Sequence, residues 1–163
     1  DECAGYLQKA INLLKSQTVA SGSSEGTLKV IITVSPIRYA KYGYHGSQLS
    51  KATLLLAADK LVKENPGVVS YFPAYEIMND ELRDYRFYKE DMLHPSEQAV
   101  EYIWERFRAT YFGKAAEQFL EDWRPIREAL GHKPFHPESE EHQKFIARTE
   151  EKKRQFEEKY HLL

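Results

Sequence analysis

The sequence predicts an α/β fold built on a parallel sheet, and three features of the chain carry that prediction. Residues 28–34 are an almost continuous β-branched and apolar run that ends at Ser35-Pro36, and residues 68–72 are a second such run that ends at Pro73. Between them lies a segment with apolar residues at helical spacing. A run that is apolar on both faces is typical of a buried parallel strand. The order strand, helix, strand then predicts a right-handed crossover between parallel strands.

Helical segments flank the first strand. Residues 3–15 carry apolar residues at helical spacing and predict an amphipathic helix, whereas the Ser- and Gly-rich residues 16–26 predict a flexible loop. The crossover helix is expected to be capped by Ser47 and to stop at residues 65–67, which read Asn-Pro-Gly. Its expected packed stripe consists of Leu49, Ala52, Thr53, Leu56 and Ala57.

Another helix is expected after the second strand. Residues 74–90 are dense in charged and aromatic side chains, which is typical of a loop or short helix that shapes a site. The helix that follows should open at Pro95, with His94 or Ser96 as its cap. The residues expected on its buried face are Ala99, Val100, Ile103, Trp104 and Phe107.

The chain is expected to divide at residue 112. Residues 113–163 predict a helical extension: a helix containing Pro125, a break at 131–137, and a charged helix over 138–160 with i,i+4 ion pairs. Two strands are fewer than the roughly five or six of an ordinary sheet. We therefore expect further strands from residues upstream of Asp1 or from a second chain, including a second copy in a homo-oligomer.

Composition excludes several classes of protein. A chain of 163 residues with 42% hydrophobic content can bury a core, and a net charge of −2 argues against a nucleic-acid surface. The single cysteine, Cys3, leaves no disulfide within the chain and no cysteine-rich zinc site. No apolar run reaches the roughly 20 residues of a membrane span, so a soluble protein is expected. Because the chain starts at Asp1 rather than at a methionine, its compartment stays open, with the cytoplasm as the default.

Asp91 and His94 are the candidate catalytic residues. An aspartate and a histidine three residues apart, on a loop that leads into a helix, can place a carboxylate against one imidazole nitrogen and leave the other free. That is the orienting half of a nucleophile-activating triad. The same spacing also fits a plain turn, because a histidine before a proline is often only a cap or turn residue.

Three further residues are candidates for substrate binding at the carboxyl ends of the strands, where open parallel sheets bind ligands. Arg38 and His45 could bind a carboxylate or phosphate, or could belong to a solvated loop with a salt bridge. Glu76 could line the site, or could pair with Arg83 or Arg86.

A nucleophile and a metal site are both harder to find. Ser35 ends a strand on the ligand side of the sheet, but Pro36 leaves no sharp strand-to-helix turn. Three histidines near prolines lack a regular zinc spacing and favour a plain turn, so no metal is expected. They are His132, His136 and His142.

Five blocks of the chain resemble the GSCFA domain family, which itself resembles the SGNH, or GDSL-like, hydrolases. They are TVSPIR (33–38), HGSQLSKA (45–52), YFPAYEI (71–77), LRDYRFY (82–88) and DMLHPS (91–96). The later HKPF (132–135) and the charged helix also look like the tail of that family. The resemblance implies that residues 1–112 are the C-terminal part of a three-layer α/β/α domain and that residues 113–163 are its helical extension.

The resemblance also implies acyl-ester hydrolysis by a serine nucleophile, with a small-molecule ester as substrate and no metal or organic cofactor. His94 would be the general base, and Asp91 would fix its tautomer. The nucleophile would lie in a Gly-Ser-Cys-Phe-Ala segment upstream of Asp1, because that segment does not occur in the 163 residues. The alternative is a non-catalytic, truncated module that acts in protein interaction, with the charged C-terminal helix as a docking element.

Overall fold

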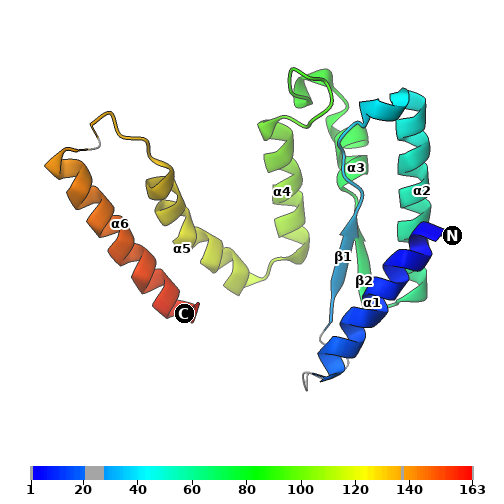
Figure 1. Ribbon diagram of the computed structural model, residues 1–163, viewed down its shortest axis with the longest axis horizontal. Helices are drawn as coiled ribbons and strands as arrows, with labels where there is room; N and C mark the ends of the chain where they lie inside the picture. Colours follow the sequence, from blue (N-terminus) through cyan, green and yellow to red (C-terminus); the bar gives the residue numbers. More distant parts are fainter. Residues whose placement is uncertain (1, 21–27, 137, 163) are drawn as a thin grey trace. The chain divides into compact units, whose positions relative to one another are not determined.

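A computed structural model describes residues 2–20, 28–136 and 138–162. The chain divides into two compact units, Asp1–Phe107 and Arg108–Leu163. The elements of the first unit are α1 (Glu2–Ala20), β1 (Val30–Thr33), α2 (Gly43–Glu64), β2 (Val69–Phe72) and most of α4 (Glu97–Tyr111), together with short helical turns (Figure 1). The second unit contains α5 (Lys114–Gly131) and α6 (Glu140–Lys159). None of these described helices is long and apolar enough to cross a membrane.

β1 and β2 pair as a small two-stranded parallel sheet, which confirms the predicted strand pairing. The register aligns Val30 with Val69 and Thr33 with Phe72, and α2 connects the two strands. The predicted stop signal is also confirmed, because α2 ends at residue 64 and Gly67 then takes a left-handed conformation with φ 74°. Apart from this sheet, the described part of the chain is mostly helical.

Helices cover both faces of the strand pair (Figure 1). On one face, Ile11 of α1, Leu61 of α2 and Val69 of β2 form a buried core. On the other face, the ring of Phe72 meets Phe107 of α4 edge to face, with 5.1 Å between ring centres. The alternation of side chains along a strand sends Val69 and Phe72 to opposite faces. The sheet is thus held between α1 with α2 on one side and α4 on the other.

The first helix is longer than predicted. α1 runs to residue 20, so residues 16–20 are helical and do not belong to a loop. The hydroxyls of Ser16 and Thr18 donate to the carbonyls of Leu13 and Leu14, which lie three and four residues earlier. These bonds satisfy the polar side chains within the helix, and the helix continues through them. Residues 21–26 of the predicted loop lie outside the described residues.

The buried face of α2 differs from the predicted stripe. Leu49 and Leu56 of that stripe are exposed, Leu56 by 72%. The buried side chains are Ser47, Lys51, Ala57, Ala58 and Leu61, so Ala57 is the one residue of the predicted stripe that is buried. The helix begins at residue 43, four residues before Ser47, so this serine is not the N-cap that we predicted; its Oγ accepts the backbone N–H of Tyr39 at 3.2 Å. Hydrophobicity selected the wrong face because the packed face of this helix contains small and polar side chains.

β1 and α4 are also less buried than predicted. Ile31 of β1 and the α4 side chains Val100 and Trp104 are exposed, and Ala99 is the buried residue of α4. A sheet of two strands offers little surface to cover the side chains on its faces. The prediction that β1 is buried on both faces is therefore wrong for the part of the chain that the structure describes.

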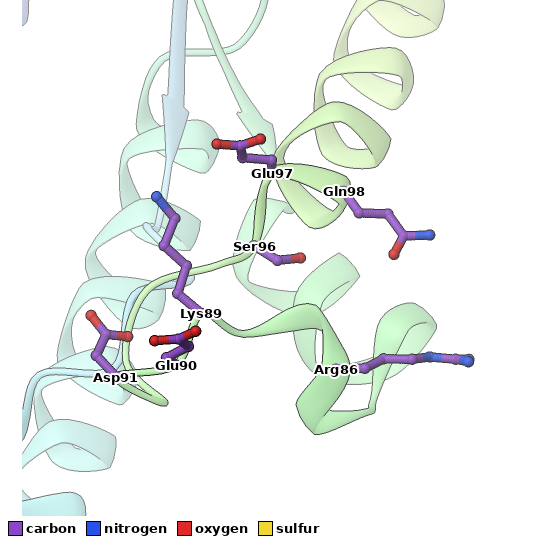
Figure 2. A pocket seen from close by; sticks show the side chains of 7 residues that line it. All are labelled: Arg86, Lys89, Glu90, Asp91, Ser96, Glu97 and Gln98. Atoms are coloured by element: carbon purple, nitrogen blue, oxygen red, sulfur yellow. The ribbon is translucent and has the colours of Figure 1, made fainter.

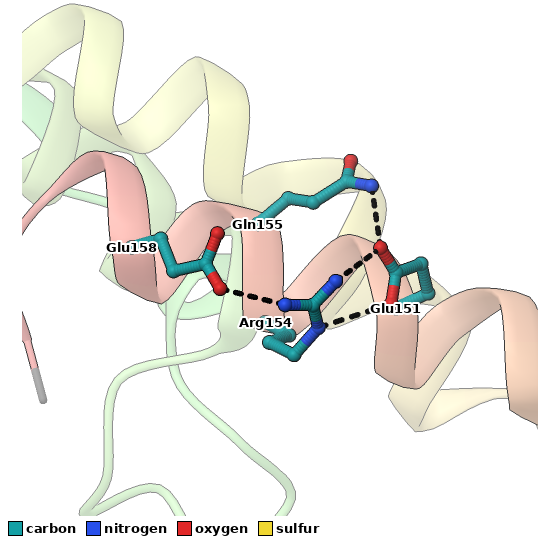
Figure 3. A network of polar contacts seen from close by, with 4 residues as sticks. All are labelled: Glu151, Arg154, Gln155 and Glu158. Atoms are coloured by element: carbon teal, nitrogen blue, oxygen red, sulfur yellow. Dashed lines mark hydrogen bonds and ion pairs between the residues drawn. The ribbon is translucent and has the colours of Figure 1, made fainter.

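The second unit is a pair of helices joined by aromatic packing. Phe119 of α5 lies 4.9 Å from Phe156 and 4.7 Å from Tyr160 of α6, measured between ring centres. Helix α5 continues through Pro125. The outer surface of α6 carries ion pairs, as predicted, and Figure 3 shows one cluster in which Arg154 lies 2.7 Å from Glu158 (i,i+4) and also pairs with a glutamate three residues earlier.

Candidate active site

Asp91 and His94 form the centre of the candidate site. They lie on the loop between the short helical turn η3 (Tyr85–Phe87) and α4. One carboxylate oxygen of Asp91, Oδ2, lies 2.5 Å from Nδ1 of His94. The other oxygen, Oδ1, accepts the backbone N–H groups of Leu93 at 2.9 Å and of His94 at 3.0 Å. The carboxylate is therefore held by the backbone at one oxygen and faces the imidazole with the other.

These hydrogen bonds stabilise the ionised form of Asp91. The backbone N–H groups of His94 and Leu93, followed by the His94 ring, lower the pKa of Asp91 to about 2. The carboxylate therefore stays ionised even in moderately acidic solution. The side chains of His94 and Asp91 are 54% and 44% exposed, so a solvated surface surrounds the pair. Its geometry comes from the backbone donors and not from burial.

The loop that carries the pair is closed by its own backbone. The N–H of Lys89 donates to the carbonyl of His94 at 2.8 Å, and the N–H of Met92 donates back to the carbonyl of Lys89 at 2.9 Å. Met92 takes a left-handed conformation with φ 58°, which is uncommon for a residue with a side chain. A tight turn of this kind is what brings a histidine back to an aspartate only three residues earlier.

Ser96 caps the helix behind the loop, as predicted. α4 begins at Glu97, and Oγ of Ser96 accepts the N–H of Ala99 at 3.2 Å. The prediction that Pro95 opens the helix is wrong: Pro95 precedes the cap and pairs with Tyr88 in an isolated antiparallel bridge. With the serine as the cap, the first helical position falls two residues beyond the proline.

Arg38 connects the loop after β1 to the loop of the pair. Its backbone N–H donates to the carbonyl of Leu93 at 3.0 Å, and its Nη1 donates to the carbonyl of Met92 at 3.1 Å. The guanidinium also lies 4.6 Å from the ring centre of Tyr44 and 5.5 Å from that of Tyr88. Neither a solvated side chain nor a simple salt bridge describes this residue, because it holds the backbone on which His94 sits.

The other two predicted binding residues make no hydrogen bond or ion pair with Asp91 or His94 within the described residues. His45 is exposed in the first turn of α2. Glu76, which ends the short helix α3 (Ala74–Glu76), accepts the Tyr71 hydroxyl at 2.8 and 3.1 Å. Burial, followed by this hydrogen bond, raises the pKa of Tyr71. Tyr71, and neither Arg83 nor Arg86, is thus the hydrogen-bond partner of Glu76.

Within residues 2–20, 28–136 and 138–162, no serine hydroxyl forms a hydrogen bond with the ring of His94. Oγ of Ser35 accepts the N–H of Ile37 at 3.3 Å, and Ser47 and Ser96 make the contacts described above. In the same residues, no three His, Cys, Asp or Glu side chains gather as they would around a metal ion. The expectation that a nucleophile lies outside this chain stays a prediction.

Two family models match this chain. A model described as the GSCFA family matches residues 2–107, and a model described as the C-terminal domain of GSCFA domain proteins matches residues 123–163. This chain belongs to the GSCFA family. The membership confirms the resemblance that five short blocks predicted. No match was found among the curated proteins or the solved structures.

The GSCFA chain also buries a lysine that the sequence analysis missed. Nζ of Lys51 donates to the carbonyl of Ser35, at the end of β1, and lies 5.6 Å from the ring centre of Tyr75. Burial lowers the pKa of Lys51. The lysine follows the buried Ser47 by four residues, so it lies on the same face of α2. That spacing was the available signal, but the apolar stripe on the opposite face obscured it.

Two open pockets lie beside the loop that carries Asp91 and His94. One, of about 640 Å³, lies between η3 and the start of α4 and includes Asp91, Ser96 and Arg86 in its lining (Figure 2). The second, of about 260 Å³, includes Arg38 and Arg83. His94 lines neither pocket, whereas its neighbours Asp91 and Arg38 line one each.

Proposed function

We propose that the GSCFA domain is a serine-dependent acyl-ester hydrolase of the SGNH type. His94 takes the proton of a serine hydroxyl as general base and returns it to the leaving alcohol as general acid, while Asp91 fixes its tautomer and stabilises the imidazolium. The serine comes from a segment outside the 163 residues. This chain would contribute the later strands and helices of a three-layer α/β/α domain.

The contact by which Asp91 orients the His94 ring is the observation that supports the proposal. Ionised Asp91 has only acceptor atoms, so the imidazole nitrogen that faces Oδ2 at 2.5 Å carries the proton. The other nitrogen, Nε2, is then the acceptor of the neutral ring, as a general base requires. It has no hydrogen-bond partner among the described residues, and the side chain is more than half exposed. A hydroxyl from another segment can approach it.

The proposed substrate is a small-molecule ester, and the mechanism uses no metal or organic cofactor. Arg38, His45 and Glu76 are the proposed substrate-binding residues. Of these, Arg38 is linked to the catalytic loop by two hydrogen bonds, so a group bound at its guanidinium would lie beside that loop.

Hydrolysis of short-chain p-nitrophenyl esters by the full-length protein tests the proposal. We expect His94→Gln to lower kcat at least about 10³-fold, because a general base and its orienting partner together supply acceleration of this order. The matched control is His142→Gln on α6, in the other unit, which should keep full activity. Reaction with a fluorophosphonate probe, followed by mass spectrometry, should locate the serine. Activity that survives in His94→Gln would exclude the role assigned to this residue.

A non-catalytic interaction module is the second candidate, and the surface of the second unit favours it. Phe135, between α5 and α6, is 98% exposed, and Leu130 of α5 and Ile146 of α6 are also exposed. Where exposed apolar side chains form a contiguous patch, they often mark a protein-binding site. A full-length protein that neither hydrolyses esters nor reacts with the fluorophosphonate probe would support this function over the first.

A further inference from the structure

The smaller pocket beside the loop of the pair has the composition of an anion-binding site. It has a volume of about 260 Å³, and two guanidinium groups, Arg38 and Arg83, line it together with amide and phenol side chains. Arg38, which lines the pocket, also donates a hydrogen bond to the loop that carries His94, the candidate base. Any group bound there would therefore lie next to the proposed catalytic machinery.

The guanidinium of Arg38 is positioned by its neighbours, and some of its N–H groups have no acceptor among the described residues. Its guanidinium lies 4.6, 5.5 and 6.0 Å from the ring centres of Tyr44, Tyr88 and Tyr85. Nη1 donates to the carbonyl of Met92, whereas Nε and Nη2 have no acceptor among the described residues. A positioned guanidinium with free N–H groups is suited to a carboxylate or phosphate, because its donors form a planar fork.

Arg83 supplies the second cation. It follows the π-helical turn η2 (Ile77–Leu82) in a left-handed conformation with φ 44°, and its backbone N–H donates to the carbonyl of Met78 at 3.3 Å. Its side chain is exposed and makes no hydrogen bond or ion pair within the described part of the chain. The cation therefore has no internal counter-charge to displace before it binds a ligand.

The remaining polar groups leave the pocket positive. Asp84 also lines it, but its carboxylate is engaged by Arg86, through the backbone N–H at 3.0 Å and the side chain at 3.7 Å. Gln48, which also lines the pocket, accepts the Tyr75 hydroxyl at 2.8 Å through its oxygen, and its NH₂ has no acceptor among the described residues. The pocket therefore has two cations and one amide donor, against a single carboxylate that already pairs with Arg86.

We propose that this pocket binds the carboxylate or phosphate group of an anionic ester, so that the substrates of the GSCFA domain carry a negative charge beside the ester bond. The assignment of that ester as a substrate rests on the proposed hydrolase function, whereas binding of the anion does not. Pockets for drug-sized ligands measure roughly 300–1,000 Å³. The volume of about 260 Å³ suits a small charged group.

Titration of the ¹⁵N-labelled chain, followed by amide chemical shifts, tests the binding directly. Monomethyl succinate supplies a carboxylate, methyl phosphate supplies a phosphate, and dimethyl succinate is the neutral control. We expect at least one of the two anions to shift the amides of Arg38 and residues 83–88, and the neutral ester to leave them in place. The better anion identifies the charged group of the substrate.

Arg83→Gln is the informative variant, because it removes the charge without removing any hydrogen bond of the described fold. It should weaken the binding of the anion about tenfold or more, as expected for lost charge-assisted hydrogen bonds. The matched control is Arg148→Gln, at an exposed arginine of α6, which should leave the affinity unchanged. No shift from either anion, equal shifts from the neutral ester, or an unchanged affinity in Arg83→Gln would each overturn the inference.

Hydrolysis assays separate this inference from the proposed function. In the full-length protein, Arg83→Gln should raise KM for p-nitrophenyl hemisuccinate and leave KM for p-nitrophenyl butyrate unchanged. Anion binding without any ester hydrolysis would contradict only the hydrolase. His94-dependent hydrolysis of neutral esters without anion binding would contradict only the anion site.

Discussion

Replacement of Asp91 by asparagine tests whether Asp91 fixes the tautomer of His94, and the test does not require catalytic turnover. In the wild-type chain the ionised carboxylate only accepts hydrogen bonds, so Nδ1 of the ring keeps the proton. An asparagine can keep its carbonyl oxygen on the backbone N–H groups of Leu93 and His94, but its other terminal group is then an NH₂ that donates. Facing a donor, Nδ1 must accept, and the ring proton moves to Nε2.

The size of this effect follows from the pKa of Asp91. A pKa of about 2 leaves about one carboxyl in 10⁵ protonated at pH 7, so the wild-type population is almost entirely in the accepting state. The asparagine variant has no accepting charge at that position at any pH. We therefore expect a nearly complete exchange of tautomers. In the full-length protein, the wrong tautomer should lower kcat by about 10⁴-fold if the proposed mechanism holds.

Long-range ¹H–¹⁵N correlation spectra of the histidine rings measure the tautomer. The spectra should be recorded in alkaline buffer, where imidazole rings are neutral. We expect His94 to carry its proton on Nδ1 in the wild type and on Nε2 in Asp91→Asn. The matched control is Asp59→Asn on α2, whose native carboxylate lies 2.8 Å from Lys63; it should not alter His94. A wild-type ring protonated on Nε2, or a tautomer unchanged in Asp91→Asn, would refute the argument.

Three further predictions concern charge and packing. His94→Ala should raise the pKa of Asp91 only part of the way from about 2 to 3.8, as measured by ¹³C carboxyl titration, because the backbone donors remain; a full return would contradict their role. Hydrogen bonds from Lys159, Tyr160 and Gln118 lower the pKa of Asp122 to about 2, so its stabilising contribution is present above its ordinary pKa of 3.8 and is lost as the pH falls toward 2. Asp122→Asn should therefore flatten the pH dependence of the melting temperature in that window, and an unchanged dependence would refute this. Leu61→Ala, at a fully buried position, should lower the free energy of unfolding in urea by about 2–5 kcal/mol. Leu56→Ala, at a residue that is 72% exposed on the same helix, should change it by at most about 0.5 kcal/mol, and equal losses would contradict the observed burial.

The features that the sequence predicted correctly are those with local causes. The parallel pairing of the strands followed from two short apolar runs with a helical segment between them. The contact between Asp91 and His94 followed from a spacing of three residues, which one tight turn can close. Ser96 was recognised as a cap because its role depends only on the residues directly after it. Signals of this kind act over a few positions, so they can be read from the chain alone.

The features that the sequence did not predict depend on residues far apart in the chain. Arg38 meets the carbonyls of Met92 and Leu93, more than fifty positions later, and only the tertiary structure brings them together. The packed face of α2 depends on which side of the helix meets the sheet, and a polar residue such as Lys51 is buried there because the carbonyl of Ser35 accepts its hydrogen bond. Hydrophobic periodicity reveals neither the tertiary contacts of Arg38 nor the packed face of α2.

Asp91 and His94 are exposed, and this exposure affects how the His94 ring can be oriented. Burial would cost the ionised Asp91 its hydration, and it would raise the pKa of the carboxyl group unless new donors replaced the lost water. Two backbone N–H groups of the same loop replace that water at a solvated surface, so the orientation of His94 does not depend on a closed, dry pocket. Arg38 then ties the loop to the end of the sheet, which keeps the imidazole in place relative to the strands. If His94 is the proposed base, its ring is oriented before a nucleophile arrives, which is the arrangement needed if another segment supplies the serine.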